Sequence, residues 1–449
     1  MGNRQNARGT RRTETRGVTA ISVSGYKSIR QEQRVEIRPL TILAGANSSG
    51  KSSIMQPLLL LKQTLEAPYD PGPLLLDGPN VQITSADQVL SKTVGQEAAS
   101  GFSVGLEIAE RFRSRMHFEK VPGKAFDIAS VSYATGSGQT TKVRRGMSPD
   151  EIDRVLAPEF KELDKQMRSS GKQGLQWSVV RNRCFLELAG QIEGMPPLTS
   201  GPIGFLGQSL GAHIEKIIHV PGLRGNPERT YRTSAVGEEF AGRFNDYVAS
   251  VISQWQGGPG EPKLNLLGKN LEDLGLTWKI QAKQVDAARV ELRVGRLPHS
   301  RRGGAADLVS IADVGFGVSQ TLPVVVALLV AKPGHMVYLE QPEIHLHPRA
   351  QSRMAAMLAD AARRGVVVVA ETHSSLLLRG VQTLVAKGEL SPELVKLHWF
   401  KRRAEDGATE VHSADLDEHG RYGEGWPEDF DEVSLTAEAE YLDAVETRQ

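Results

Sequence analysis

The chain has 449 residues, 39% hydrophobic and 24% charged, which is typical of a globular protein and excludes a fibrous or disordered one. Lys and Arg number 54 against 53 Asp and Glu, so the net charge is +1 and any affinity for nucleic acid has to come from a local basic patch. The single cysteine, Cys184, excludes an internal disulfide, and we expect a cytoplasmic protein. Since the apolar stretches are too short for a bilayer, we expect no membrane contact.

The first 65 residues contain a basic segment, then short predicted strands, and then a predicted helix. Residues 1–17 contain five arginines and almost no apolar side chain, which predicts a flexible basic arm that is either a solvated tail or a contact to nucleic-acid phosphates. Short β-branched segments at 19–23, 35–37 and 41–44 predict strands. A leucine-rich segment from Ser52 to about Leu65 predicts a helix.

The middle of the chain, 101–300, is interpreted as an insertion of strands and helices. Alternating apolar residues between 102 and 133 predict an antiparallel meander. A capping box that begins at Ser148 predicts a helix to about Met167. A second helix is expected from about Glu238 to a glycine-rich turn at 257–260, followed by a hairpin that pairs 276–280 with 290–294.

From Ile311 onward, helix and strand patterns alternate. Helices are expected at 322–330 and 349–363, and buried strands at 336–339 and 366–370. Short apolar strands that alternate with helices are typical of a parallel sheet, so the fold class is α/β.

The strongest motif runs from Gly45 to Ser52 and matches G-x-x-x-x-G-K-[ST]. A strand precedes it and a helix follows, so its backbone N–H groups and the helix dipole are expected to bind phosphates. Lys51 is predicted to reach the β- and γ-phosphates, and Ser52 to ligate Mg²⁺. The motif therefore predicts ATP and Mg²⁺ as cofactors. The predicted nucleotide contacts are Gly45, Asn47, Ser48, Gly50, Lys51, Ser52 and Ser53.

An acidic segment, which would complete the phosphate site, follows the strand at 336–339. Glu340 takes the place of a Walker B carboxylate and is predicted to hold Mg²⁺ directly or through water. Gln341 stands where many related ATPases have the catalytic glutamate; a glutamine can orient water but cannot accept its proton. Glu343 is the nearest alternative base, so Gln341 and Glu343 are both candidates for the catalytic position.

Histidines follow both of these strands. His373 lies just beyond the strand at 366–370, at the sheet edge where ligands bind, and is predicted to sense the γ-phosphate. His345 and His347 could share a metal, but no third ligand is apparent nearby, which favours a structural or dimer-contacting loop.

The segment before the helix at 322–330 is rich in glycine. A helix start of this kind presents exposed N–H groups to an anion. Because the chain already has its own P-loop, we expect this segment to close on the γ-phosphate of a second copy, which predicts a homodimer or a higher homo-oligomer that buries ATP. The predicted contacts are Gly315, Gly317, Ser319 and Gln320.

Together these motifs resemble the ATP-binding-cassette ATPases of the SMC/RecF/OLD type. The resemblance rests on Gly25–Ile29, the Asn47-containing P-loop, the Glu-x-Pro-Glu-x-His-Leu-His-Pro element and Thr372-His373-Ser374. It also includes a Gly-Trp-Pro-Glu tail at 425–428, which is similar to that of stand-alone bacterial members.

The resemblance implies a P-loop ABC-ATPase head, with a mixed sheet flanked by helices and an antiparallel β subdomain. Residues 18–100 and 301–404 would form the two halves of this head, 101–300 the inserted region, and 405–449 an acidic tail. Such proteins hydrolyse ATP to ADP and phosphate as dimers, and Gln341 suggests slow turnover.

The function implied by the closest resemblance is that of a sensor or scaffold in bacterial anti-phage defence, as in Septu-type and PARIS-type systems. It would regulate a separately encoded effector, a nuclease or toxin. The alternative is a RecF/SMC-like repair ATPase that clamps DNA, for which the basic candidates are Arg293, Arg296, Arg301 and Arg302. A transporter motor fits less well, because its signature string is missing.

Overall fold

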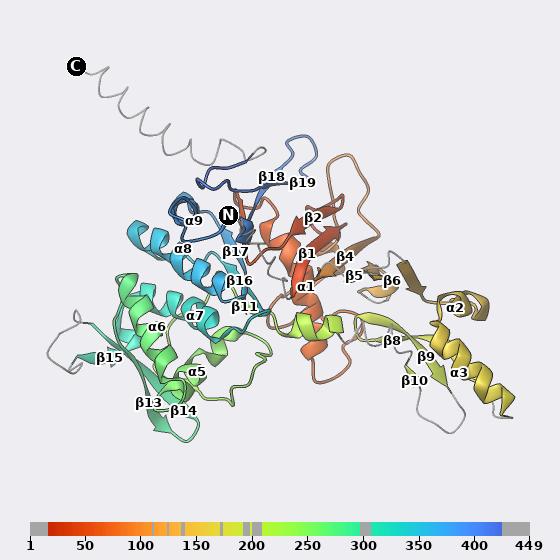
Figure 1. The fold of residues 1–449 in the computed structure, drawn as a ribbon, viewed down its shortest axis with the longest axis horizontal. Coiled ribbons are helices and arrows are strands. Elements are labelled where there is room, and N and C mark those ends of the chain that lie inside the picture. Colours follow the sequence, from red (N-terminus) through yellow and green to blue (C-terminus); the bar gives the residue numbers. More distant parts are fainter. Residues whose placement is uncertain are drawn as a thin grey trace, which may run out of the picture.

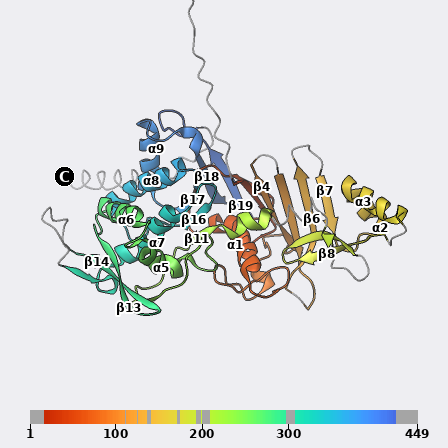
Figure 2. The same cartoon turned by 60° about the horizontal axis from the view of Figure 1, so that its bottom comes forward.

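The computed structural model describes residues 17–109, 112–123, 125–135, 140–170, 174–191, 198–199, 209–296 and 307–423. The basic arm apart from Gly17, Arg301 and Arg302, and the tail from residue 424 with its Gly-Trp-Pro-Glu motif lie outside these ranges. Figures 1 and 2 show an elongated molecule with a helical lobe at one end and a β extension at the other. Within the described ranges no helix is both long and apolar enough to span a membrane.

The centre of the molecule is a six-stranded mixed sheet assembled from both halves of the chain. Its order is β11-β16-β17-β3-β18-β19, and only β19 runs antiparallel to its neighbour. The strands are β11 Ile218–Val220, β16 Met336–Glu340, β17 Val367–Thr372, β3 Leu40–Gly45, β18 Val395–Arg402 and β19 Thr409–Ala414. Because β3, β16 and β17 are parallel, their carboxyl ends lie at one edge of the sheet.

One face of the mixed sheet is covered by helices from the C-terminal half of the chain. Val337, Leu339 and Val368 point into this core, as period-two alternation requires. Three helices from the same part of the chain contribute to it, and the figures place them side by side over this face. They are α7 Phe316–Val330, α8 Pro348–Arg363 and α9 Ser375–Ala386.

The other face of the mixed sheet packs against α1, Lys51–Glu66. Tyr338 and Val369 share one core with Leu58–Leu61 of this helix. Burying each of these leucines contributes about 2 kcal/mol relative to its exposed state. The same core continues on the far side of α1 into a second sheet, so α1 lies between two sheets and its N-terminus is fixed at the carboxyl end of β3.

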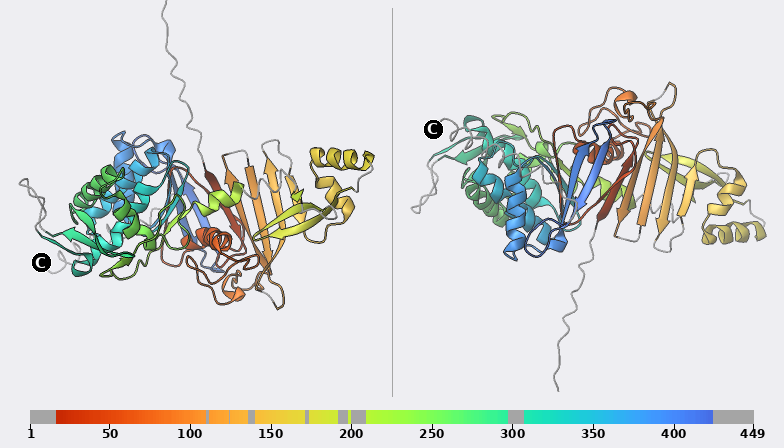
Figure 3. Two further views of the ribbon diagram at one scale, coloured as in Figure 1. Left: turned by 90° about the horizontal axis from the view of Figure 1, so that it is seen from below. Right: turned by 90° about the horizontal axis from the view of Figure 1, so that it is seen from above.

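The second sheet is antiparallel, in the order β2-β1-β4-β5-β6-β7. Its strands are β2 Gln33–Glu36, β1 Val18–Ser24, β4 Gly101–Ile108, β5 Phe112–Glu119, β6 Asp127–Thr135 and β7 Thr140–Arg144. Phe102, Met116 and Val131 point into the core with α1, while the alternate residues face outward. Figure 3 shows this sheet from two sides.

The remaining elements lie at the two ends of the molecule. The β extension ends in α2 Pro149–Val155, α3 Pro158–Ser169, β8 Gln176–Asn182, β9 Phe185–Gln191 and β10 Leu198–Thr199. The helical lobe adds α5 Val248–Trp255, α6 Glu261–Asp273, β12 Tyr231–Arg232, β13 Ile280–Asp286, β14 Arg289–Gly295 and β15 Leu308–Ser310. Short 3₁₀ turns are η1 Ala86–Gln88, η2 Phe244–Tyr247, η3 Ile311–Asp313 and η4 Pro392–Leu394.

The fold class predicted from the sequence is confirmed: a mixed sheet flanked by helices with an antiparallel β subdomain. Several predicted elements have different bounds, and the helix expected at 322–330 begins earlier, at Phe316. The helix expected from Ser148 to Met167 is two helices, because Pro158 disfavours helical backbone at the residue before it. The helix expected from Glu238 begins only at η2 Phe244–Tyr247, and the hairpin strand expected at 276–280 begins at Ile280.

Candidate nucleotide-binding site

The loop between β3 and α1 is shaped by two glycines with left-handed backbone angles. Gly45 has φ +144° and Gly50, which precedes α1, has φ +108°. A Cβ atom on Gly45 would lie 2.3 Å from the Phe400 carbonyl oxygen, and one on Gly50 would lie 2.4 Å from Thr409 Oγ1. Both the angles and the space therefore require glycine, and the loop curls as a phosphate-binding loop must.

Lys51 is 4% exposed and lies inside the curl of this loop. Its Nζ donates to the carbonyl oxygens of Gly45 at 2.9 Å and Ala46 at 2.8 Å. Burial lowers the pKa of Lys51 to about 8, while the carboxylates of Glu371 and Glu343 act in the opposite direction. The ammonium is thus held in the loop by weak neutral acceptors, which a phosphate would replace with charge-assisted bonds.

The tip of the loop is exposed, and C-terminal strands hold its base. Asn47 is exposed, and Ser48 has φ +61°. The Ser48 carbonyl accepts from Arg402 Nε at 2.8 Å, and the Ser49 carbonyl accepts from Thr409 Oγ1 at 2.8 Å. The hydroxyl of Ser52, in the first turn of α1, donates to Glu371 Oε2 at 2.8 Å.

Glu340 ends β16 at the same sheet edge, but its carboxylate is bonded toward β11. Oε1 lies 3.1 Å from His219 Nε2, and Oε2 accepts from the Gly222 N–H at 3.0 Å. Burial pushes the pKa of Glu340 upward, but the hydrogen bonds and charge of its partners leave it below the usual value. Glu340 therefore stays ionised, and Ser52 bonds to a different carboxylate.

Gln341 and Glu343 follow β16 in a turn with strained backbone. Gln341 has φ +45°, a conformation that a non-glycine residue rarely adopts. Glu343 is 6% exposed, and its Oε1 accepts from Thr372 Oγ1 at 2.6 Å. In the described part of the chain its Oε2 has no hydrogen-bond partner. Burial raises the pKa of Glu343, so this carboxyl combines a free oxygen with raised basicity, as a general base requires.

His373 lies directly against the P-loop. Its backbone N–H donates to Glu343 Oε1 at 3.2 Å, and its ring hydrogen-bonds the Gly45 carbonyl. Burial and then the Lys51 charge lower the pKa of His373, so the ring is neutral at pH 7. Distant parts of the sequence thus meet around Lys51, as expected, while the roles assigned to Glu343, Gln341 and His373 stay predictions.

The predicted signature segment lies at the start of α7. Gly315 precedes the helix, and Phe316 is 54% exposed there. Ser319 Oγ bonds back to the Phe316 carbonyl at 3.1 Å. Gln320 differs from the rest of the segment, because its side chain is buried and donates to the Gly225 carbonyl at 2.6 Å. Gly317 packs against Leu276.

The histidine pair after the Walker B position has no metal-site geometry. The described residues contain no group of three or more His, Cys, Asp or Glu side chains that could hold a metal ion. His347 Nδ1 accepts from the Arg349 N–H at 3.3 Å and caps α8. His345 is exposed, with its ring centroid 6.4 Å from that of Phe316.

Two residues of the site were not predicted from the sequence. Glu371, the residue before Thr372, touches Ser52 and is 3% exposed; burial, followed by the nearby Glu340 charge, raises its pKa to about 7. A charged residue at the end of an apolar strand was the available signal. Arg224 donates to the carbonyl oxygens of Glu340 at 2.8 Å and Gln320 at 3.1 Å, and so joins β16 to α7. No sequence pattern indicated that contact.

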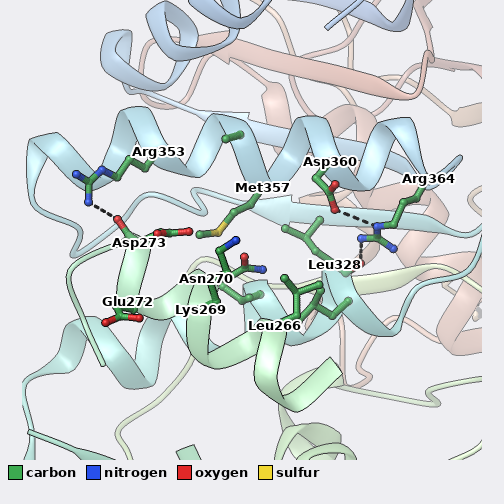
Figure 4. A pocket seen from close by; sticks show the side chains of 13 residues that line it. Leu266, Lys269, Asn270, Glu272, Asp273, Leu328, Arg353, Met357, Asp360 and Arg364 are labelled. Carbon is green, nitrogen blue, oxygen red and sulfur yellow. Dashed lines mark hydrogen bonds and ion pairs between the residues drawn. The ribbon is translucent and has the colours of Figure 1, made fainter. Parts of the chain in front are cut away.

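A separate groove of about 570 Å³ lies between α6, α7 and α8. Figure 4 shows Leu266, Leu328 and Met357 in it, with charged side chains around them. Arg364 bonds Asp360 and the Leu328 carbonyl at its rim. Its lining includes neither the P-loop nor the ends of β16 and β17, so the groove is not the phosphate site.

The donor set at the sheet edge fits magnesium and a triphosphate. A serine hydroxyl and carboxylates are the hard oxygen ligands that Mg²⁺ prefers, and Glu343 Oε2 is a buried acceptor without a partner in the described ranges. Lys51 and the N–H groups of the first turn of α1, which no side chain caps, suit phosphate oxygens. The fold and this site define a P-loop ATPase.

Residues 196–379 match the family described as "AAA domain, putative AbiEii toxin, Type IV TA system". The matched segment includes α7, β16 and β17 but not the P-loop. No curated protein matches the chain.

Solved SMC heads are similar in structure at low identity. An SMC head bound to the C-winged helix domain of ScpA has 11% identity and a TM-score of 0.44, over 90% of this chain and 98% of that chain. The SMC head domain from Thermotoga maritima has 10% identity and a TM-score of 0.36, over 88% and 98%. A head from Pyrococcus furiosus bound to the C-terminal domain of ScpA has 10% identity and a TM-score of 0.43, over 89% and 96%. The similarity is distant, and the class follows from the sheet order and the P-loop.

Proposed function

We propose that this chain binds ATP with Mg²⁺ between the P-loop and the ends of β16 and β17, and hydrolyses it to ADP and phosphate. The observation that carries the proposal is the convergence of Lys51, Glu343 and His373 at one sheet edge. Lys51 would bind the β- and γ-phosphates, and His373 the γ-phosphate. Glu343 would accept the proton of the attacking water, and Gln341 would orient that water.

The active unit is proposed to be a homodimer that closes on ATP. The start of α7 supports this, because Gly315 and Phe316 are exposed and a Cβ on Gly315 would meet open space. A helix N-terminus on the surface can approach the phosphates of a second copy. Ser319 and Gly317 would make this contact in trans, and Gln320 would anchor the segment through Gly225.

The proposed biological role is control of a separately encoded effector, a nuclease or toxin, in bacterial anti-phage defence. The support is the toxin and toxin–antitoxin description of the family matched by 196–379. The experiment is co-purification of the chain with the product of the neighbouring gene, with ATPγS and with ADP. We expect a stable complex that responds to the nucleotide, and no nuclease activity from this chain alone. Nuclease activity of the chain alone would contradict the role.

DNA clamping is the second candidate, and one surface favours it. The outward face of β5 and β7 carries four exposed basic side chains, and two of them, Arg115 and Lys142, pair with the same residue of β6, Ser132. The four are Arg113, Arg115, Lys142 and Arg144. Glutamates pair with the three arginines, whereas Lys142 has no ion-pair partner in the described residues. Duplex affinity that appears only with ATPγS, falls steeply with salt and weakens in Lys142→Glu would favour this function. Among the basic residues that the sequence indicated for DNA contact, Arg293 forms an ion pair with Glu291.

A further inference from the structure

Ser52 bonds to a carboxylate that the P-loop pattern does not include. The Ser52 hydroxyl donates to Glu371 Oε2 at 2.8 Å, and the other oxygen of Glu371 accepts from the Tyr338 hydroxyl. Glu371 is the fifth residue of β17 and lies on the α1 side of the sheet, as Val367 and Val369 do. Its carboxylate is therefore fixed at both oxygens, directly beside the first turn of α1.

Glu340 occupies the equivalent position on the neighbouring strand, but its contacts differ. Glu340 and Glu371 are register partners in the parallel pair of β16 and β17. The Glu340 carboxylate is bonded to His219 and Gly222, on the β11 side, and its backbone carbonyl accepts from Arg224. The His219 ring also stacks on Tyr338, with 5.2 Å between ring centroids. Both oxygens of the Glu340 carboxylate are therefore engaged on the β11 side, whereas the Ser52 hydroxyl bonds to Glu371.

We propose that Glu371, rather than Glu340, is the carboxylate that holds the nucleotide's Mg²⁺ together with Ser52. The inference rests on the proposed ATP site and deepens it. Mg²⁺ is bound by one or two carboxylates in addition to hydroxyl, phosphate and water oxygens, and Glu371 lies within one hydrogen bond of the P-loop hydroxyl that would share the ion. Glu340 then acts as a positioning residue that ties β11 to the end of β16.

The test measures metal binding rather than turnover. ATPγS affinity is determined by calorimetry in excess Mg²⁺ and in EDTA, for the wild type and for Glu371→Gln and Glu340→Gln. Mn²⁺ binding in the presence of ATPγS is followed by electron paramagnetic resonance. We expect Glu371→Gln to bind ATPγS in EDTA as the wild type does. The metal-dependent gain, which is the increase in ATPγS affinity from EDTA to Mg²⁺, should fall about tenfold or more, and so should the Mn²⁺ affinity. Glu340→Gln should keep both.

Controls separate the inference from the proposed function and from misfolding. Glu187→Gln removes another buried carboxylate, which bonds Asn182 far from the P-loop, and should behave as the wild type. If Glu371→Gln is unfolded by circular dichroism, Glu371→Asp replaces it; the shorter side chain keeps the charge but withdraws it from Ser52, so Mn²⁺ affinity should still fall. Loss of the metal-dependent gain in Glu340→Gln but in neither Glu371 variant would overturn the inference. A wild type that binds no ATPγS in either buffer would instead contradict the ATP site itself.

Discussion

The two six-stranded sheets place their polar side chains in different ways. The mixed sheet is covered on both faces, so the polar groups of β3, β16 and β17 gather beyond the strand ends. The antiparallel sheet has one face buried on α1, and its outward face carries polar and charged residues along the whole length of the strands, such as Arg115 and Lys142.

This difference indicates that nucleotide chemistry can occur at the edge of the mixed sheet and that surface recognition can occur on the outward face of the antiparallel sheet. Parallel strands bring residues such as Lys51 and His373, far apart in sequence, to one edge, where burial shifts their pKa values. An open antiparallel face keeps its charges in water, so each contributes little alone. Substitutions at the edge of the mixed sheet should therefore change nucleotide chemistry, and those on the outer face should leave it intact.

The largest effect is expected for Lys51→Ala. The substitution removes the buried ammonium that would pair with the β- and γ-phosphates, and charge-assisted hydrogen bonds of this kind contribute about 3 kcal/mol, so affinity should fall about 100-fold or more. Calorimetry with ATPγS measures the change. Arg113→Ala, on the outer face, is the matched control and should bind as the wild type does. Full ATPγS affinity in Lys51→Ala would contradict the placement of the nucleotide site at this edge of the mixed sheet.

The next largest effect is expected on kcat, which should fall by different amounts in two neighbouring substitutions. Glu343→Gln removes the only proposed proton acceptor and should lower kcat about 100-fold or more, with ATPγS affinity nearly unchanged. Gln341→Ala removes only a group that orients water, so its decrease should be smaller. Phosphate release at saturating ATP gives both values. The reverse order would assign the central role to Gln341.

A smaller effect, on stability, distinguishes the two faces of the antiparallel sheet. Phe102 is 1% exposed, and its ring contacts Tyr26, Phe118 and Phe126 at centroid distances of 5.4, 5.2 and 5.3 Å. Phe102→Ala should lower the free energy of unfolding by about 3–5 kcal/mol, whereas Arg113→Ala should change it by about 0.5 kcal/mol or less. Urea denaturation measures both, and equal effects would contradict the assignment of the faces.

The smallest effect is a pH dependence located in the mixed sheet. His398 on β18 is fully buried between Ser413 Oγ at 2.7 Å and the Glu36 carbonyl at 2.8 Å. Burial lowers its pKa to about 4, below the usual 6.5. The unfolded chain binds the proton first, so stability is present above pH 6.5 and is lost as the pH falls toward 4. At pH 5 the loss is roughly 2 kcal/mol.

The pH prediction is checked by urea denaturation at pH 7 and pH 5. His398→Gln, which keeps an amide beside Ser413 and has no titrating ring, should lose less stability between these two values than the wild type does. An equal loss in both proteins would assign the pH dependence to other groups.

Three strands of the mixed sheet, β3, β16 and β17, could be predicted from the sequence, because local rules act there, whereas β11, β18 and β19 were not predicted. The apolar run before Gly45 and the motif that ends at Ser52 define β3, the P-loop and α1 without tertiary information. The α6 helix was not predicted, since its buried side is only Leu264, Leu267, Gly268 and Leu271 in a polar segment.

The side-chain partners within the site depend on tertiary contacts and could not be predicted. Glu340 fits the Walker B pattern, yet the sequence contains nothing that ties its carboxylate to His219, 121 residues away. The pairing of Ser52 with Glu371 depends likewise on β17 lying next to β3, which only the sheet order reveals. Periodicity predicts which residues end a strand, but the assembled sheet determines which of them meet.

The most direct test is an experimental structure of the chain with ATPγS and Mg²⁺. We expect the triphosphate in the loop between β3 and α1, with its γ-phosphate within hydrogen-bond distance of both Lys51 and His373. A nucleotide bound elsewhere, such as in the groove between α6, α7 and α8, with Lys51 still on the carbonyl oxygens of Gly45 and Ala46, would contradict it.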